Sequence, residues 1–156
     1  MESLGDLIIR VCDRSFGAIE ALRRVFGRSK VETISTLDLE SAMKSEKSTP
    51  VLVDVRSDSE LAVSRIPGAI TQHEYEEGVE EFAGRRVVAY CTVGGRSYLF
   101  ARKLVASGVN ASNYRDSILG WCRVGLPLES PDGQPTNEVH PYWRIFHVPD
   151  EYDVKI

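Results

Sequence analysis

The chain has 156 residues, of which 42% are hydrophobic and 27% charged, a composition typical of one soluble globular domain. The formal net charge of −4 argues against a nucleic-acid partner, as does the lack of any run of Lys and Arg. No apolar run is long enough to cross a membrane. Three cysteines, an odd number, do not make a disulfide framework, so the expected compartment is the reducing cytoplasm.

Residues 1–30 are predicted to form a separate N-terminal unit, an amphipathic helix over residues 3–27. Apolar residues recur there at steps of three and four: Leu4, Leu7, Ile8, Val11, Cys12, Ile19, Leu22, Val25 and Phe26. Most arginines lie off this stripe. The helix is expected to dock on the domain or on a second copy of the chain. The alternative is weak contact with a membrane surface, which the interspersed acidic residues argue against: Glu2, Asp6, Asp13 and Glu20.

Strands and helices are predicted to alternate from Val31 onward. A short strand over Val31–Ile34 precedes a helix that Ser35 and Asp38 cap and that runs to about Lys44. The stretch Val51–Val55 is apolar almost throughout, as expected of a strand covered on both faces. This alternation is typical of a sheet flanked by helices.

The next segments are shorter. Ser57 and Glu60 form a capping-box pattern that opens a helix over residues 58–63. Residues 65–70 are predicted to form a turn that leads into a brief strand. Residues 74–82 are predicted to form an acidic helix with a solvated face.

The second half of the chain repeats the pattern. The strand Val87–Tyr90 precedes Cys91, and the helix Ser97–Ala106 follows it, with Gly108 as the residue that ends the helix. A last short strand over Asn110–Tyr114 and a last short helix over Ile118–Arg123 complete an α/β fold with a parallel sheet and helices on both faces. Residues 129–156 are predicted to be a C-terminal extension packed on the domain rather than a second domain.

Cys91 stands where a buried strand ends and a helix begins. Four residues separate it from Arg96, and they are Thr92, Val93, Gly94 and Gly95. A tight glycine-rich turn lets backbone N–H groups point inward, and the start of the helix adds its positive end. Both effects favour the thiolate, so Cys91 is predicted to be a nucleophile rather than a buried structural cysteine. Arg96 is predicted to contact an anion rather than merely to pair with an acid.

Five segments in order resemble a single-domain rhodanese over residues 31–128. They are Val51 to Arg56 with Glu60, Ile66-Pro67-Gly68-Ala69, Cys91 to Arg96, Gly120-Trp121, and Gly125-Leu126-Pro127. The resemblance implies a rhodanese-like fold with a five-stranded parallel sheet and the active-site loop at the carboxyl end of a strand. It also implies sulfur transfer, in which Cys91 takes a sulfane sulfur from a donor such as thiosulfate and carries it as a persulfide.

The resemblance further implies roles for individual residues. The N–H groups from Thr92 to Arg96 would stabilise the thiolate and the persulfide, and Arg96 would help to hold an anionic donor. Asp54 and Arg56 would support the loop, with Arg56 paired to Glu60. The pair Asp116-Ser117 departs from the glycine pair usual in the family and is expected to reshape one wall of the pocket. Cys122 is expected in the core beside Trp121 rather than as a second reactive thiol.

Loop length separates this pattern from related chemistry. Phosphatases that share the fold resemble Cys-x5-Arg, one residue longer than the loop here, because a phosphoryl group needs a wider ring. Two alternatives stay open: a binding or regulatory module that kept the fold, and a small phosphatase or arsenate reductase.

No cofactor or metal is expected, since His140 and His147 do not have the spacing of zinc ligands. The expected partners are a small-molecule sulfur donor, thiosulfate or a persulfide, and a thiol or protein acceptor. The sequence leaves the physiological donor and acceptor undefined.

Overall fold

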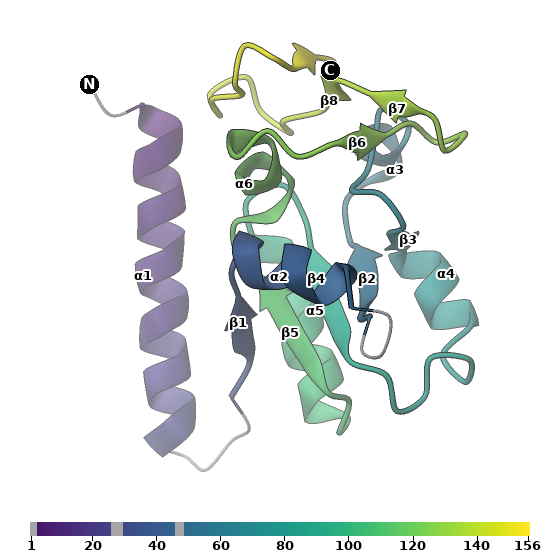
Figure 1. Cartoon of the computed structure of the whole chain (residues 1–156). Coiled ribbons are helices and arrows are strands. Elements are labelled where there is room, and N and C mark those ends of the chain that lie inside the picture. The colour runs from purple at the N-terminus through teal and green to yellow at the C-terminus, as the bar shows by residue number, and fades with distance from the viewer. Residues whose placement is uncertain (1–2, 26–29, 46–48) are drawn as a thin grey trace.

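A five-stranded parallel sheet forms the centre of the molecule, as the sequence predicts (Figure 1). The computed structural model describes residues 3–25, 30–45 and 49–156. The strand order is β1-β5-β4-β2-β3. The strands are β1 (Glu32–Ile34), β2 (Val51–Asp54), β3 (Ile70–Thr71), β4 (Val87–Tyr90) and β5 (Ala111–Tyr114). Strand β4, which leads into Cys91, therefore lies in the middle, where both of its faces are covered.

Helices lie on both faces of this sheet. The helices are α1 (Leu4–Val25), α2 (Thr36–Met43), α3 (Asp58–Leu61), α4 (Gln72–Glu77), α5 (Gly95–Ala106) and α6 (Ser117–Arg123). Alternate residues of β4 enter opposite cores: Val88 and Tyr90 pack with α2 and α6, whereas Val87 and Ala89 pack with α4 and α5. Cys91 continues the second set, so its side chain lies on the face that α5 covers.

Two predicted helix starts shift. The acidic helix spans Gln72–Glu77 rather than residues 74–82 because Thr71 and Glu74 form a capping box that the sequence analysis missed. The N–H of Gly78 closes the helix on the carbonyl of Glu74. Helix α5 begins at Gly95, two residues before the predicted start, so the Cys91 loop passes directly into the first turn of the helix.

Helix α1 docks on the domain, but most of the predicted apolar stripe takes no part: Ile8 packs against the core, whereas Leu4, Leu7, Val11, Ile19, Leu22 and Val25 are exposed. Gly5 is buried, and a side chain there would meet the carbonyl oxygen of Ile145 at 2.5 Å. Ile8 and Ile9 pack against one core, and the ring of Phe16 lies tilted against that of Tyr98 of α5, with centroids 4.4 Å apart. The predicted end of this helix, including Phe26, lies outside the described residues. None of the helices in the described part of the chain has the length and apolar character needed to cross a membrane.

The C-terminal extension packs against the sheet domain. It forms two small pairs of strands, β6 (Leu128–Glu129) with β7 (Pro135–Thr136), and β8 (Glu138–Val139) with β9 (Asp153–Val154). Leu128, Val139 and Phe146 are almost fully buried in the same core as α2 and α6. The extension therefore shares a core with the domain, and its segment at residues 141–146 lies close to the start of α1.

Candidate active site around Cys91

The thiol of Cys91 lies at the carboxyl end of β4, with only 1% of the residue exposed. The N–H of Gly94 donates to its Sγ at 3.1 Å, and the hydroxyl of Ser97 donates at 3.5 Å. The hydroxyl of Ser117 lies 3.9 Å from the Sγ but donates its single proton to the carbonyl of Tyr114 at 2.8 Å. Two donors, Gly94 and Ser97, therefore converge on the sulfur from the first residues of α5 and its N-cap.

The charge state of this thiol follows from these contacts. Burial alone would raise the pKa of Cys91, but the hydroxyl and backbone of Ser97, the positive charge of Arg96 and the N–H of Val93 oppose it. Together they hold the pKa below its ordinary value. The other core thiol shows the opposite balance, since burial raises the pKa of Cys122 to about 12. Of these two thiols, the structure favours the thiolate at Cys91.

The curvature of the loop depends on Gly94. Its φ of +91° lies in the left-handed region, and a Cβ there would come within 2.2 Å of the carbonyl oxygen of Arg115. The side-chain amide of Asn113, on β5, donates to the carbonyl of Gly94 at 3.2 Å. The glycine is thus needed both for its backbone angle and for the close approach to β5.

Helix α6 holds the other side of the loop. The N–H groups of Ile118 and Leu119 donate to the carbonyls of Cys91 and Thr92, at 3.1 and 3.3 Å. The hydroxyl of Ser117 accepts the N–H of Cys91 at 3.1 Å, and Ser117 itself has a positive φ of 54°. Ser117 therefore adopts a backbone angle that favours glycine and adds a hydroxyl that fixes Cys91.

Arg96 is anchored by Glu60 of α3. Its guanidinium donates two bonds to the carboxylate, at 2.7 and 2.8 Å, and a third to the hydroxyl of Thr92 at 2.8 Å. Glu60 is fully buried and also accepts bonds from Thr92 and from the N–H and hydroxyl of Ser57. Burial would raise the pKa of Glu60, but these donors, Arg96 foremost, lower it to about 2. One carboxylate thus ties both ends of the loop sequence Thr92–Arg96 to α3.

Asp54 and Arg56 lie at the carboxyl end of β2, beside Tyr90 at the end of β4. They form a buried ion pair with an oxygen–nitrogen distance of 2.7 Å, and Arg56 also donates to the carbonyl of Ser64. The expectation that Arg56 pairs with Glu60 is wrong. Asp54 lies two residues before Arg56, on the same side of an extended segment, and its carboxylate accepts the hydrogen bonds of the guanidinium. These two residues fix the segment between α3 and the following turn.

An aromatic side chain of the C-terminal extension reaches the rim of the loop. The ring of Tyr142 lies 4.7 Å from the guanidinium carbon of Arg96. Tyr142 itself has a positive φ of 70°, and 42% of the residue is exposed. The accessible side of Arg96 is therefore bordered by a tyrosine that lies outside the sheet domain.

Sequence reasoning missed several of these residues. The sequence places Ser97 only on the helix, and Glu60 only in a helix cap and in a pair with Arg56. The step from Cys91 to Ser97 carries a usable signal, because a Cys-x5-Ser spacing across a strand–helix turn brings the hydroxyl back over the thiol. Nothing in the local sequence signals the approach of Tyr142, which lies far along the chain.

Fold and site together define the class of protein: an α/β protein whose central strand presents a thiol of lowered pKa in a four-residue loop closed by arginine. The chain belongs to the rhodanese-like family, since the model of the Rhodanese-like domain matches residues 35–124. A protein of Allochromatium vinosum named sulfurtransferase is 37% identical over 87 residues, which cover 53% of this chain and 81% of the relative.

Solved structures agree with this assignment. A rhodanese-like domain protein from Staphylococcus aureus superposes with a TM-score of 0.54 at 27% identity, over 64% of this chain and 98% of that chain. A thiosulfate sulfurtransferase from Pseudomonas aeruginosa gives a TM-score of 0.60 at 24% identity, over 80% of this chain and 23% of that one, a likeness of fold alone. The prediction of a rhodanese-like fold is confirmed.

Proposed function

We propose that the protein is a sulfurtransferase that carries a sulfane sulfur as a persulfide on Cys91. The observation that carries the proposal is the convergence of the Gly94 N–H and the Ser97 hydroxyl on a buried sulfur whose pKa is lowered. A structural cysteine needs neither donor, whereas an anionic sulfur needs both.

The reaction has two steps, each an attack by a nucleophile on sulfur. With thiosulfate as donor, the Cys91 thiolate attacks the outer sulfur and a new S–S bond forms. The S–S bond of thiosulfate breaks, and its electron pair leaves with sulfite. An acceptor such as cyanide or a thiolate then attacks the outer sulfur of the persulfide, which releases the Cys91 thiolate again. No external oxidant or reductant is required.

The loop has a distinct task in each state. The donors that surround Sγ stabilise the thiolate before the transfer, and the N–H groups of the tight turn would serve the terminal persulfide sulfur afterwards. Arg96 contributes less charge to the donor than a solitary arginine would, because Glu60 neutralises it through two hydrogen bonds. This reduced charge is compatible with thiosulfate and with a less charged persulfide donor, and a compact sulfur suits the short loop better than a phosphoryl group.

The test is mass spectrometry after incubation of the full chain with thiosulfate. We expect one added sulfur atom on the peptide that contains Cys91, and its discharge by cyanide. Cys91→Ser removes both, while Cys122→Ser is the matched control at the other buried thiol and retains them. Full transfer by Cys91→Ser would overturn the proposal.

Two other results would support the alternative functions, a phosphatase or a binding module. Hydrolysis of an aryl phosphate that depends on Cys91 would support a phosphatase. Absence of transfer from thiosulfate and from small persulfides, together with specific capture of a protein partner, would support a binding module.

A further inference from the structure

Helix α1 turns a row of apolar side chains away from the domain. These residues, here called the outer seam, are Leu4, Leu7, Val11, Ala18, Leu22 and Val25, and all are exposed. The large ones are exposed by 51% to 80%. The helix is 22 residues long, which gives a seam of about 33 Å. An exposed apolar row of this length marks a contact surface.

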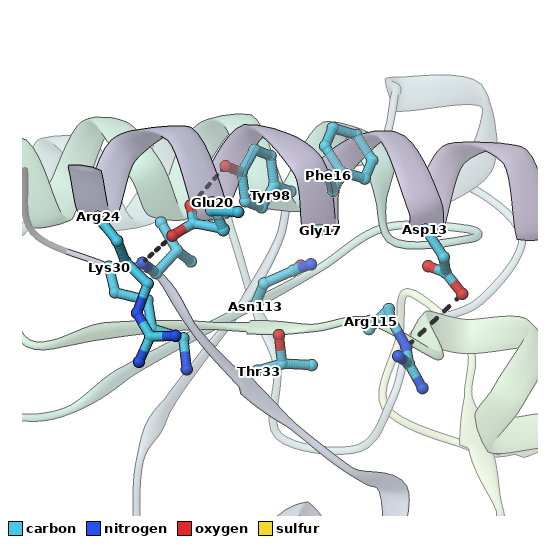
Figure 2. Close-up of a pocket in the computed structure, with 12 residues that line it drawn as sticks. Asp13, Phe16, Gly17, Glu20, Arg24, Lys30, Thr33, Tyr98, Asn113 and Arg115 are labelled. Atoms are coloured by element: carbon cyan, nitrogen blue, oxygen red, sulfur yellow. Dashed lines mark hydrogen bonds and ion pairs between the residues drawn. The ribbon is translucent and has the colours of Figure 1, made fainter. Parts of the chain in front are cut away.

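The acidic residues of α1 all face the domain and have partners there. Asp6 pairs with Arg123 at 3.3 Å, and Asp13 lies 3.8 Å from Arg115. Glu20 accepts bonds from the hydroxyl of Tyr98 and the N–H of Val31. Figure 2 shows Asp13 and Glu20 pointing from the helix toward the domain, at either end of a cavity of about 310 Å³ between α1 and the sheet edge. Of the four acids that counted against membrane contact, Asp6, Asp13 and Glu20 are therefore absent from the outward surface of Leu4–Val25, and Glu2 lies outside the described residues.

The charge along the border of the seam is positive. Arg10 and Arg14 are exposed and follow one another along one side of the helix. Arg24 is not part of this border, because it lines the cavity between α1 and the domain with Lys30, and Figure 2 shows it on the same side of the helix as Glu20. The outward surface of α1 thus combines apolar and basic side chains without an acidic one.

The two edges of the sheet differ in charge. Helix α1 lies beside β1, at one edge of the sheet, while the acidic segment 74–81 follows β3 at the other edge (Figure 1). Its glutamates are exposed: Glu74, Glu76, Glu77, Glu80 and Glu81. A negative surface would attract the α1 edge and repel the α4 edge, which orients the whole chain.

A second copy of the chain fits this surface poorly. In a symmetric antiparallel pair with Leu4 opposite Val25, Arg14 of each copy falls at the centre of the seam, beside the other Arg14. A parallel pair places the two Arg14 side chains opposite each other as well. Since the described outward surface of α1 offers no carboxylate, neither arrangement compensates these charges.

We propose that the outer seam of α1 binds an anionic lipid surface, with the helix lying in the plane of the membrane interface. Apolar side chains enter the acyl boundary and the arginines contact lipid phosphates, which is the usual arrangement of an interfacial helix. The inner face of α1 contacts the Cys91 loop region, where Phe16 lies 3.8 Å from the Cβ position of Gly95. Binding therefore holds the loop about one helix diameter, roughly 10 Å, from the lipid.

The test is sedimentation of the full chain with vesicles of zwitterionic lipid alone or mixed with phosphatidylserine or phosphatidylglycerol. We expect binding only to the anionic vesicles, with loss at high salt. Arg10→Gln/Arg14→Gln weakens it by about 25-fold, at about fivefold for each arginine. The matched control Arg85→Gln/Lys103→Gln removes the same charge from exposed positions elsewhere and leaves binding unchanged.

A second pair of variants tests the apolar part. Leu7→Ser/Leu22→Ser weakens vesicle binding by at least about tenfold, whereas Leu37→Ser/Leu99→Ser, at similarly exposed leucines, does not. Equal binding to both vesicle types, or none, overturns the proposal. So does a dimer in size-exclusion chromatography with light scattering that Leu7→Ser/Leu22→Ser converts to monomer, since the occupant would then be a second copy. Sulfur transfer is measured on the same variants and is expected to stay unchanged in solution.

Discussion

Glu60 and Arg96 form a two-bond ion pair that joins α3 to the first turn of α5, with nitrogen–oxygen distances of 2.7 and 2.8 Å. The carboxylate is fully buried, while the arginine side chain is 37% exposed. Because Thr92 bonds to both partners, the pair fixes the loop at its second and last residues. The arginine that closes the loop is thus positioned before any donor arrives, and positioning of this kind lowers the reorganisation that the transfer step requires.

The first prediction concerns the stability of this pair against acid. The pKa of Glu60 is about 2 in the folded chain and ordinarily 4.5. A depressed pKa adds stability that is fully present above the ordinary value and is lost as pH falls through the folded value. We therefore expect the free energy of unfolding to decline as the pH falls from about 5 to about 2. Glu60→Gln should lower it by about 2–3 kcal/mol at neutral pH and flatten this decline.

Urea unfolding at a series of pH values measures this effect. Asp58→Asn, on the same helix but exposed, is the control and should keep the acid-dependent decline of the original chain. An equally steep decline in Glu60→Gln would show that other carboxylates account for the acid sensitivity.

The second prediction concerns Ser97. Its hydroxyl donates to the Sγ of Cys91, so Ser97→Ala should raise the pKa of that thiol and slow persulfide formation at neutral pH by about tenfold. The rate should recover as pH rises and the thiolate fraction is restored. Ultraviolet absorbance of the thiolate, titrated in a Cys12→Ser/Cys122→Ser background, follows the pKa directly.

Ser107→Ala is the control for Ser97→Ala. Its hydroxyl bonds to a backbone carbonyl at the other end of α5, and neither the thiol titration nor the rate should change. A Ser97→Ala variant with an unaltered titration curve and a slower rate would instead assign Ser97 a purely structural role.

The fold and the position of the central thiol could be predicted because short local sequence patterns indicate both. Apolar runs of four or five residues and capping residues such as Ser35 and Ser57 mark the elements, and the glycines after Cys91 mark the turn. The Asp54–Arg56 pair was within reach too, since residues two apart on extended chain share a side. The mistaken assignment of Arg56 to Glu60 came from the family resemblance and not from the local pattern.

Other features depend on contacts between distant segments. Glu60 meets Arg96 only because β2 and β4 are neighbours in the sheet, which the order of strands along the chain does not disclose. Helix α1 docks through Gly5 and Phe16 rather than through its more apolar face because the close approach at Gly5 and the ion pairs of Asp6 and Asp13 decide the orientation. A helical periodicity identifies an apolar face but not what covers it.

The last prediction concerns Gly94. A methyl group there would meet the carbonyl oxygen of Arg115 at 2.2 Å, and the residue has a φ of +91°. Gly94→Ala should therefore combine backbone strain with a clash against rigid backbone, and lower the free energy of unfolding by about 2–5 kcal/mol. The loop must shift to relieve the clash, which moves the Gly94 N–H away from Sγ, so persulfide formation should be lost even where the variant folds.

Gly108→Ala separates the two causes. Gly108 has a similar φ of +85°, but a Cβ there meets no atom within 4 Å. In this control, backbone strain alone should lower the free energy of unfolding by about 1–2 kcal/mol, and the variant should keep full sulfur transfer. Comparable losses of stability in the two variants would show that strain alone acts at Gly94. Retention of transfer by a folded Gly94→Ala would show that the N–H of Gly94 is dispensable, since a loop displaced from β5 no longer aims that donor at the sulfur.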